Sequence, residues 1–176
     1  MKLGRLNHVG VATPSLDQAI AFWRETMGAQ VIREPFDLPA QGVRVCFVDT
    51  PNGQVELLEP LGDSSPIAGF LAKNPAGGQH HICFEVPEIN EAHAYFTATG
   101  AKVLGQPRIG AHGTPVFFVH PKDMGGVLTE IMETPKGARV LGEPRIGAHG
   151  TPIFFVHPRD MGGVLTEIME TPREGH

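Results

Sequence analysis

Apolar and polar positions alternate in short segments along this chain, and two longer segments show helical periodicity. Residues 6–13 (LNHVGVAT) alternate as in a half-buried strand. The segment after Ser15 places Leu16, Ile20 and Trp23 on one helical face, and Ser15 is a suitable N-cap for that helix. Three strand-like segments follow at residues 30–33, 43–49 and 54–59. The pattern therefore predicts a strand, a helix and three further strands.

The same order of elements begins again near residue 80. A strand is predicted at residues 80–86 and a helix at 89–99, followed by strands at 101–104, 115–120 and 127–133. Leu16 and Trp23 of the first helix correspond to Ile89 and Phe96 of the second at a constant sequence offset. We therefore expect an α+β fold of two paired βαβββ modules, at about residues 4–60 and 79–135. A Gly/Pro/Ser-rich segment at residues 61–78 joins them.

A second and much stronger repeat occupies the end of the chain. Residues 100–136 recur as residues 137–173, and 32 of the 37 aligned positions are identical. The five differences are conservative: Lys102/Arg139, Gln106/Glu143, Val116/Ile153, Lys122/Arg159 and Lys136/Arg173. Two copies are too few for a solenoid. We expect a two-module domain at residues 1–136 and a near-copy of its last three strands at 137–176. That copy should add to a sheet edge, exchange between subunits or compete with the first copy.

Composition narrows the possible classes of function. A hydrophobic content of 41% with 19% charged residues is typical of a globular protein. The formal charge of −5, with no basic stripe, argues against a nucleic-acid partner. Cys46 and Cys83 stand in apolar segments outside any C-x-x-C pattern, which predicts buried, reduced thiols. No signal peptide and no membrane span is predicted, so we expect a soluble, cytoplasmic protein.

Two His–Glu pairs occupy equivalent positions in the two modules. His8 and His81 lie in the first strand of each module, and Glu56 and Glu130 lie in the last strand, at nearly the same sequence offset. If the modules pack about a twofold axis, these four side chains can converge on one point. Two imidazoles and two carboxylates suit a divalent transition metal with open coordination positions. A single strand histidine is more often structural, so it is the internal symmetry that favours a metal site.

The other histidines are expected to have simpler roles. His80 neighbours His81 in a strand, so alternation predicts that it points to the opposite face. Each copy of the strong repeat has one histidine in a turn and one at a strand end: His112 and His120, and their copies His149 and His157. These histidines hold turns or contact a substrate, and holding turns is the simpler interpretation.

Four segments together resemble a known family: LNHVGVATPSLDQAIAFW, NGQVELLEPLGDSSPIAGFLAKN, GGQHHICFEV and PRIGAHGTPVFFVHPKDMGGVLTE. They resemble the methylmalonyl-CoA epimerases of the vicinal-oxygen-chelate superfamily, which includes glyoxalase I, over residues 4–135. The resemblance implies an acyl-CoA substrate, a homodimer and a divalent metal ion, with Co²⁺ or Mn²⁺ fitting the family. It also implies the metal ligands His8, Glu56, His81 and Glu130.

The reaction that the resemblance implies is the interconversion of (R)- and (S)-methylmalonyl-CoA. The C2 proton leaves from one face and returns on the other, through an enolate that the metal stabilises. Glu130 is the best candidate for a base that contacts both metal and substrate. Some relatives carry a second glutamate after a Q-G-V motif, where this chain has Val45, so the second acid/base is unassigned. The alternatives are a glyoxalase-type isomerase, an iron dioxygenase and a metal-free small-molecule-binding protein on the same scaffold.

The strong repeat gives Glu130 a twin, Glu167, since both lie in a G-G-V-L-T-E segment. The spacing from His81 to Glu130 is nearly the same as that from His8 to Glu56, whereas Glu167 lies one whole repeat further along the chain. Long insertions cost only roughly 0.6 kcal/mol per doubling of loop length. Connectivity therefore favours Glu130 modestly as metal ligand and base, and Glu167 stays its alternative.

Overall fold

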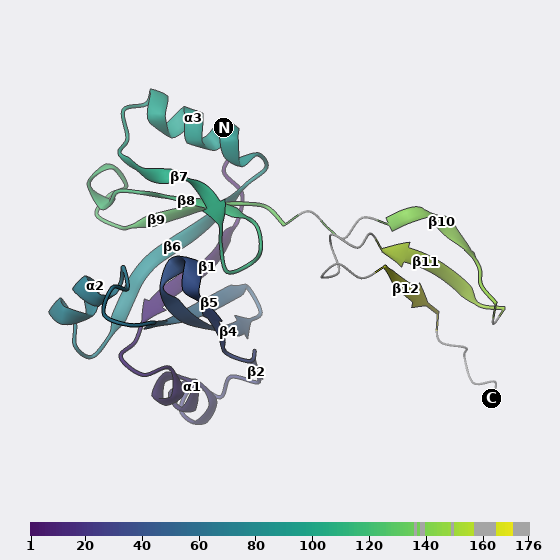
Figure 1. The fold of residues 1–176 in the computed structure, drawn as a ribbon, viewed down its shortest axis with the longest axis horizontal. Helices are drawn as coiled ribbons and strands as arrows, with labels where there is room; N and C mark the ends of the chain where they lie inside the picture. Colours follow the sequence, from purple (N-terminus) through teal and green to yellow (C-terminus); the bar gives the residue numbers. More distant parts are fainter. Residues whose placement is uncertain (136, 138–139, 149, 157–164, 171–176) are drawn as a thin grey trace. The chain divides into compact units, whose positions relative to one another are not determined.

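The described strands form two separate β-sheets. The computed structural model describes residues 1–135, 137, 140–148, 150–156 and 165–170. The chain divides into two compact units, Met1–Thr134 and Pro135–His176. Figure 1 shows the strands of each unit.

The first unit contains two modules of the same kind. The first module comprises β1 (Leu6–Ala12), α1 (Leu16–Glu25), β2 (Val31–Ile32), β3 (Phe36–Leu38), a 3-10 turn (Pro39–Gln41), β4 (Val43–Thr50) and β5 (Gly53–Pro60). The second comprises β6 (Gly78–Val86), α3 (Ile89–Ala98), β7 (Val103–Ile109), β8 (Pro115–Val119), a 3-10 turn (Pro121–Asp123) and β9 (Thr129–Glu133), and α2 (Ala68–Lys73) lies between the modules. The predicted α+β fold of paired βαβββ modules is confirmed. The short strand β3 was not predicted.

One sheet runs through both modules. Its strand order is β2-β4-β5-β1-β6-β9-β8-β7, with β3 beside β4. β1 and β6 are antiparallel neighbours at the centre, while β5 runs parallel to β1 and β9 runs parallel to β6. The order is therefore symmetric about the β1–β6 pair, as two modules related by a twofold axis require. In Figure 1, α3 lies at the top of this unit and α1 at its bottom.

One face of each half of the sheet packs against a helix. In the second module Phe117 and Ile131 are buried with Phe96 of α3 in one apolar cluster. Alternate residues of a strand face opposite sides, so Phe118 and Glu130 lie on the other face. Both of these side chains line a cleft on that face.

A glutamate from the last strand of each module holds the first turn of the module's helix. The Leu16 amide donates to Glu59 Oε1 at 3.3 Å, and the Ile89 amide donates to Glu133 Oε2 at 3.1 Å. Ser15 caps α1 as predicted. A carboxylate at a helix N-terminus is stabilised by the helix dipole and by free amide groups. The equivalence of these two contacts further supports the internal symmetry.

The second unit repeats the three strands that end the second module. β10 (Val140–Ile146), β11 (Pro152–Val156) and β12 (Thr166–Met169) form an antiparallel sheet in that order. The pairing register is preserved, since Ile153 pairs with Met169 as Val116 pairs with Met132. The copy thus folds into the same local structure as its original.

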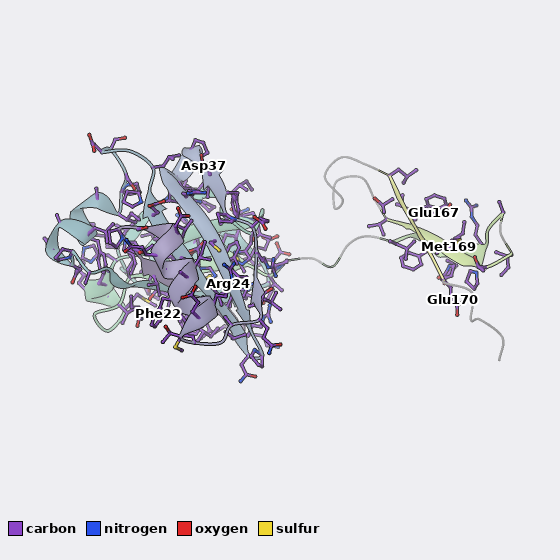
Figure 2. All side chains as sticks on the ribbon, turned by 90° about the horizontal axis from the view of Figure 1, so that it is seen from below. Phe22, Arg24, Asp37, Glu167, Met169 and Glu170 are labelled. Atoms are coloured by element: carbon purple, nitrogen blue, oxygen red, sulfur yellow. The ribbon has the colours of Figure 1, made fainter. Side chains whose placement is uncertain are left out.

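The two copies differ in how far they bury their last strand. Ile131 and Met132 of β9 are fully buried, whereas Ile168 and Met169 of β12 are 39% and 44% exposed. Figure 2 labels Glu167 and Met169 on this strand and Glu170 directly after it. Within its own unit, the described part of the copy includes no helix and no fourth strand to cover these side chains.

Two predictions from composition can be compared directly with the structure. Cys46 and Cys83 are both buried and free, as predicted. Among the described residues, none of the helices has the length and apolar character needed to cross a membrane.

Candidate metal centre

Four buried side chains from four neighbouring strands meet near the middle of the sheet. They are His8 on β1, Glu56 on β5, His81 on β6 and Glu130 on β9. Each offers one ligand atom, and these atoms all lie within 4.8 Å of one another. The structure thus brings together the four residues that the sequence predicts as metal ligands, and these four residues form what we call the cluster.

Each ligand atom of the cluster is close to both ligand atoms of the opposite type. Glu130 Oε2 lies 3.0 Å from His81 Nε2 and 3.4 Å from His8 Nε2. Glu56 Oε2 lies 3.3 Å and 3.5 Å from the same two nitrogens. The two Nε2 atoms are 3.2 Å apart. Two imidazole nitrogens and two carboxylate oxygens therefore face a common centre.

The strand register explains why these residues converge. Two rows of paired residues cross the sheet: Glu56–Gly10–His81 over β5, β1 and β6, and His8–Cys83–Glu130 over β1, β6 and β9. Residues directly opposite each other in a sheet present their side chains on the same face. The middle residue of each row, Gly10 or Cys83, is small, which leaves room for the rings and carboxylates beside it.

The chemistry of the cluster fits a divalent cation. With both imidazoles neutral, Glu56 and Glu130 bring two buried negative charges, and unpaired buried charges are strongly unfavourable. A divalent ion would neutralise both charges. Imidazole nitrogen and carboxylate oxygen are ligands of Zn²⁺, Mn²⁺, Co²⁺ and Fe²⁺.

Without a metal, hydrogen bonds and opposite charges between the histidines and the glutamates hold the cluster together. Burial alone lowers the pKa of His81, but hydrogen bonds and charges of Glu130 and Glu56 outweigh it and raise the pKa to about 9. Burial alone raises the pKa of Glu130, but hydrogen bonds from His8 and His81 and their charges lower it to about 2. At neutral pH the metal-free protein therefore pairs a protonated His81 with an ionised Glu130.

These pKa shifts predict how the stability of the metal-free protein depends on pH. The raised pKa of His81 stabilises the fold fully below its ordinary value of 6.5, and this contribution is lost as the pH rises through about 9. The lowered pKa of Glu130 stabilises the fold fully above its ordinary value of 4.5, and this contribution is lost as the pH falls through about 2. We expect the melting temperature of chelator-treated protein to be highest between these ordinary values, as measured by scanning calorimetry.

The same scan with saturating Mn²⁺ is the control, because metal binding requires deprotonated histidines. The loss of stability above neutral pH should then disappear. The assigned ion pair would be contradicted if the melting temperature of the metal-free protein rose steadily as the pH was raised from 6.5 to about 9.

Glu56, His81 and Glu130 also line a cleft of about 220 Å³. Most of its wall is apolar, formed by Val43, Leu58, Ile67, Leu104, Phe118 and Leu128. Gln41, His80 and Arg108 add polar groups to this wall. An apolar cleft with a few polar groups beside a cluster of ionisable residues is typical of a small-molecule site.

The position of His80 corrects the prediction that it faces away from the site. Gly10 pairs with His81 and Val11 pairs with Gln79, so His80 has no partner on β1. This irregularity interrupts the alternation of side chains, and His80 lines the cleft beside His81. Burial, followed by the charge of His81, lowers the pKa of His80 to about 4.

His112 supports the cluster, a role that the sequence did not predict. Its ring stacks on that of His8, with centroids 5.1 Å apart and planes at 19°. Its Nε2 lies 2.7 Å from Gln54 Oε1, and Phe47 packs against its ring. The loop between β7 and β8 thereby braces a histidine of the other module.

His120 has the turn-holding role that was predicted. Its Nδ1 accepts a hydrogen bond from the Lys122 amide at 3.1 Å, at the start of the second 3-10 turn. The copies His149 and His157 lie outside the described residues.

Two further predicted positions lie apart from this chemistry. Glu167 lies on β12 of the second unit, where its side chain is exposed. Val45, which stands where some relatives have a glutamate, is fully buried on β4 in an apolar cluster with Phe47 and Leu58. It therefore contributes packing and no acid or base.

Comparisons with known proteins agree with this geometry. The sequence profile of the Glyoxalase/Bleomycin resistance protein/Dioxygenase superfamily matches residues 7–118. The chain is 56% identical over 131 residues to the ethylmalonyl-CoA/methylmalonyl-CoA epimerase of Cereibacter sphaeroides, covering 73% of this chain and 97% of that protein. It is 55% identical over 130 residues to the mitochondrial methylmalonyl-CoA epimerase of Homo sapiens, covering 73% of each chain.

A solved structure shows the same similarity in three dimensions. A variant of Streptomyces coelicolor methylmalonyl-CoA epimerase in complex with 2-nitronate-propionyl-CoA superimposes with a TM-score of 0.69 and 35% sequence identity. The match covers 77% of this chain and all of that one. At this level of identity the likeness extends beyond the fold to the sequence.

Proposed function

The chain belongs to the Glyoxalase/Bleomycin resistance protein/Dioxygenase superfamily and, within it, to the methylmalonyl-CoA epimerases, and on that premise we propose that it interconverts (R)- and (S)-methylmalonyl-CoA. The observation that carries the proposal is the buried cluster of His8, Glu56, His81 and Glu130 at the wall of an apolar cleft. The cluster offers both a cation site and a carboxylate base where a small acyl group can bind.

The four cluster residues would hold a divalent metal ion, and Co²⁺ or Mn²⁺ is the proposed choice. When bound, such an ion supplies a positive charge that polarises the thioester carbonyl of the substrate and acidifies the neighbouring C2–H bond. The cluster is buried, and electrostatic interactions are stronger where water is excluded.

Glu130 is the proposed base. As a ligand of the metal, Glu130 would be a deprotonated carboxylate, and a carboxylate can accept a proton. In the reaction Glu130 takes the C2 proton, and the electron pair of the broken C–H bond moves toward the thioester oxygen. A proton that originates from solvent returns to the opposite face of C2, and Glu130 releases its own proton to solvent, which completes the inversion. Because one proton leaves C2 and one proton returns to it, the product has the same composition as the substrate and the opposite configuration at C2.

The other groups of the cleft would bind and orient the acyl group. Arg108 on β7 brings a positive charge to the cleft, which suits the free carboxylate of the substrate. Gln41 donates a hydrogen bond to the Ile109 carbonyl at 3.1 Å and so links the 3-10 turn of the first module to β7. The apolar side chains would exclude water from the reacting carbon. A homodimer is a further prediction of the family resemblance, and a cytoplasmic location stays a prediction made from the sequence.

A single epimer of methylmalonyl-CoA provides the test. The full-length chain loaded with Co²⁺ or Mn²⁺ should convert it to the equilibrium mixture, as followed by chromatography on a chiral phase. Removal of the metal with a chelator should abolish conversion, and adding the metal back should restore it. Ethylmalonyl-CoA should be tested in parallel, since the Cereibacter relative is named for both substrates. Full activity without any divalent ion would contradict the proposal, as would isomerisation of a glutathione hemithioacetal in place of the acyl-CoA.

A further inference from the structure

The residue immediately before each cluster histidine lies at an irregularity of its strand. Leu6 pairs with Phe84 and His8 with Cys83, so Asn7 is an extra residue on β1. The same pairing of β1 with β6 leaves His80 as an extra residue on β6. The sequence offset from Asn7 to His80 equals the offset from His8 to His81. The two β-bulges are therefore equivalent under the internal symmetry.

A β-bulge can re-aim a side chain that would otherwise point away from its neighbour. Asn7 is only 5% exposed, and its Oδ1 lies 2.9 Å from His8 Nδ1. His80 Nδ1 lies 3.1 Å from His81 Nδ1. In both modules the bulged residue therefore contacts the ring nitrogen of the next histidine that faces away from the cluster.

The hydrogen-bond partners of Asn7 determine which ring nitrogen of His8 carries the proton. Its Nδ2 donates to Glu85 Oε1 at 2.6 Å, and the same oxygen accepts from Arg5 Nε at 2.8 Å. An ionised carboxylate only accepts hydrogen bonds, so the amide must turn its NH₂ group toward Glu85. The amide oxygen then faces His8 and can only accept, which requires a proton on His8 Nδ1.

A proton on Nδ1 leaves the other ring nitrogen, Nε2, with its lone pair. Nε2 is the atom that both histidines direct to the cluster. At His81 the equivalent arrangement has Nδ1–H donating to His80 Nδ1. The ring of His80 is itself held by an edge-to-face contact with Phe70, at a centroid distance of 5.2 Å and 87°.

We propose that Asn7 and His80 are positioning residues that hold His8 and His81 as Nδ1-protonated tautomers, so that both Nε2 atoms are free to bind the metal. The inference rests on the metal site of the proposed function. Groups that orient a histidine ligand in this way typically change metal affinity or activity by about 10–100-fold when removed. Glu85 contributes indirectly, because it orients the Asn7 amide that in turn contacts His8.

Co²⁺ alone is the probe, and its affinity for the full-length chain is measured by competition with a chelator. Asn7→Leu removes the acceptor and should weaken Co²⁺ binding by about 10–100-fold. Asn7→Asp keeps an acceptor for His8 but places the new carboxylate next to the carboxylate of Glu85, so Co²⁺ binding should weaken as well. The double variant Asn7→Asp/Glu85→Gln restores a donor opposite the new carboxylate and should recover most of the affinity. His80→Phe should weaken binding and His80→Gln, whose amide can accept, should weaken it less.

Asn90→Leu is the matched control, because Asn90 is exposed on α3 and the same change there should leave Co²⁺ affinity unaltered. Nitrogen-15 NMR of the metal-free wild type reports the tautomer of His8 directly, and His8 should carry its proton on Nδ1. It also keeps the inference testable if Asn7→Leu does not fold.

Three results would overturn the inference: a folded Asn7→Leu variant with wild-type affinity, a double variant that binds no better than Asn7→Asp, or a His8 proton on Nε2 alone. A wild-type chain that binds Co²⁺ and shows the expected tautomer of His8, yet epimerises no substrate, would overturn the proposed function alone.

Discussion

Glu130→Ala is expected to abolish epimerase activity, whereas Glu167→Ala should leave most of it. Glu130 lies on β9, which pairs in parallel with the strand of His81, and its Oε2 is 3.0 Å from His81 Nε2. The substitution removes a metal ligand together with the proposed base. Loss of a positioned general base alone typically costs about 10²–10⁴-fold in rate. Rates of conversion of a single epimer, measured with saturating metal, provide the comparison.

Glu167 is a matched control within the same chain, because the two glutamates share the sequence G-G-V-L-T-E. The described pairing of β12 is with β11 alone, and the Glu167 side chain is exposed. Two other results would each assign the site differently. Loss of activity in Glu167→Ala alone would mean that the second copy builds the site. Partial loss in both variants would mean that the copies exchange.

Gly10→Ala is expected to damage the site nearly as severely. A Cβ at position 10 would overlap the imidazole ring of His81 and would lie 2.7 Å from its Nε2. Gly10 is the middle residue of the row that joins Glu56 to His81, so neither neighbour can withdraw without disturbing the sheet. A displacement of about 1 Å in a reacting group can cost about 10²-fold in rate. We expect a loss of at least about 100-fold in activity, and weaker Co²⁺ binding.

Gly69→Ala provides the control for this substitution. A Cβ at position 69 would meet no atom within 4 Å, and the residue lies in α2. Alanine there should keep full activity and raise stability by about 0.5–1 kcal/mol. Gly10→Ala with wild-type activity and Co²⁺ affinity would show that His81 does not need its present position.

The sequence predicts the cluster because the signal is carried by spacing. The separation of His8 from Glu56 nearly equals that of His81 from Glu130, and both pairs stand at equivalent places in two periodic patterns. Alternation of apolar and polar positions then fixes which face each side chain occupies. Those two features suffice to place four residues from four strands at one point.

The β-bulges at Asn7 and His80 are not predictable in the same way. A bulge is a property of a strand pair, and the pairing of β1 with β6 joins segments from different modules, far apart in the sequence. Strict alternation therefore assigned His80 to the wrong face. The contacts of Asn7 with Glu85 and of His112 with His8 are likewise long-range, so no local pattern indicates them.

The strong repeat illustrates a different limit of prediction. Near-identity of the two copies predicts that both form the same three strands, and their registers agree. Yet Ile131 is fully buried whereas its copy Ile168 is 39% exposed, because burial depends on the strand and helix beside β9 and not on the repeat itself. Identical segments can thus have different surroundings, and only the surroundings decide which glutamate serves the site.

Deuterium incorporation at C2 reports whether the chain inverts its substrate by exchanging the C2 proton at the metal site. A single epimer of methylmalonyl-CoA is incubated in D₂O with the metal-loaded chain and analysed by mass spectrometry and NMR. We expect the inverted product to carry one deuterium at C2, and we expect neither inversion nor incorporation after the metal is removed. Inversion without solvent deuterium at C2, or substrate left unchanged by the metal-loaded chain, would contradict this mechanism.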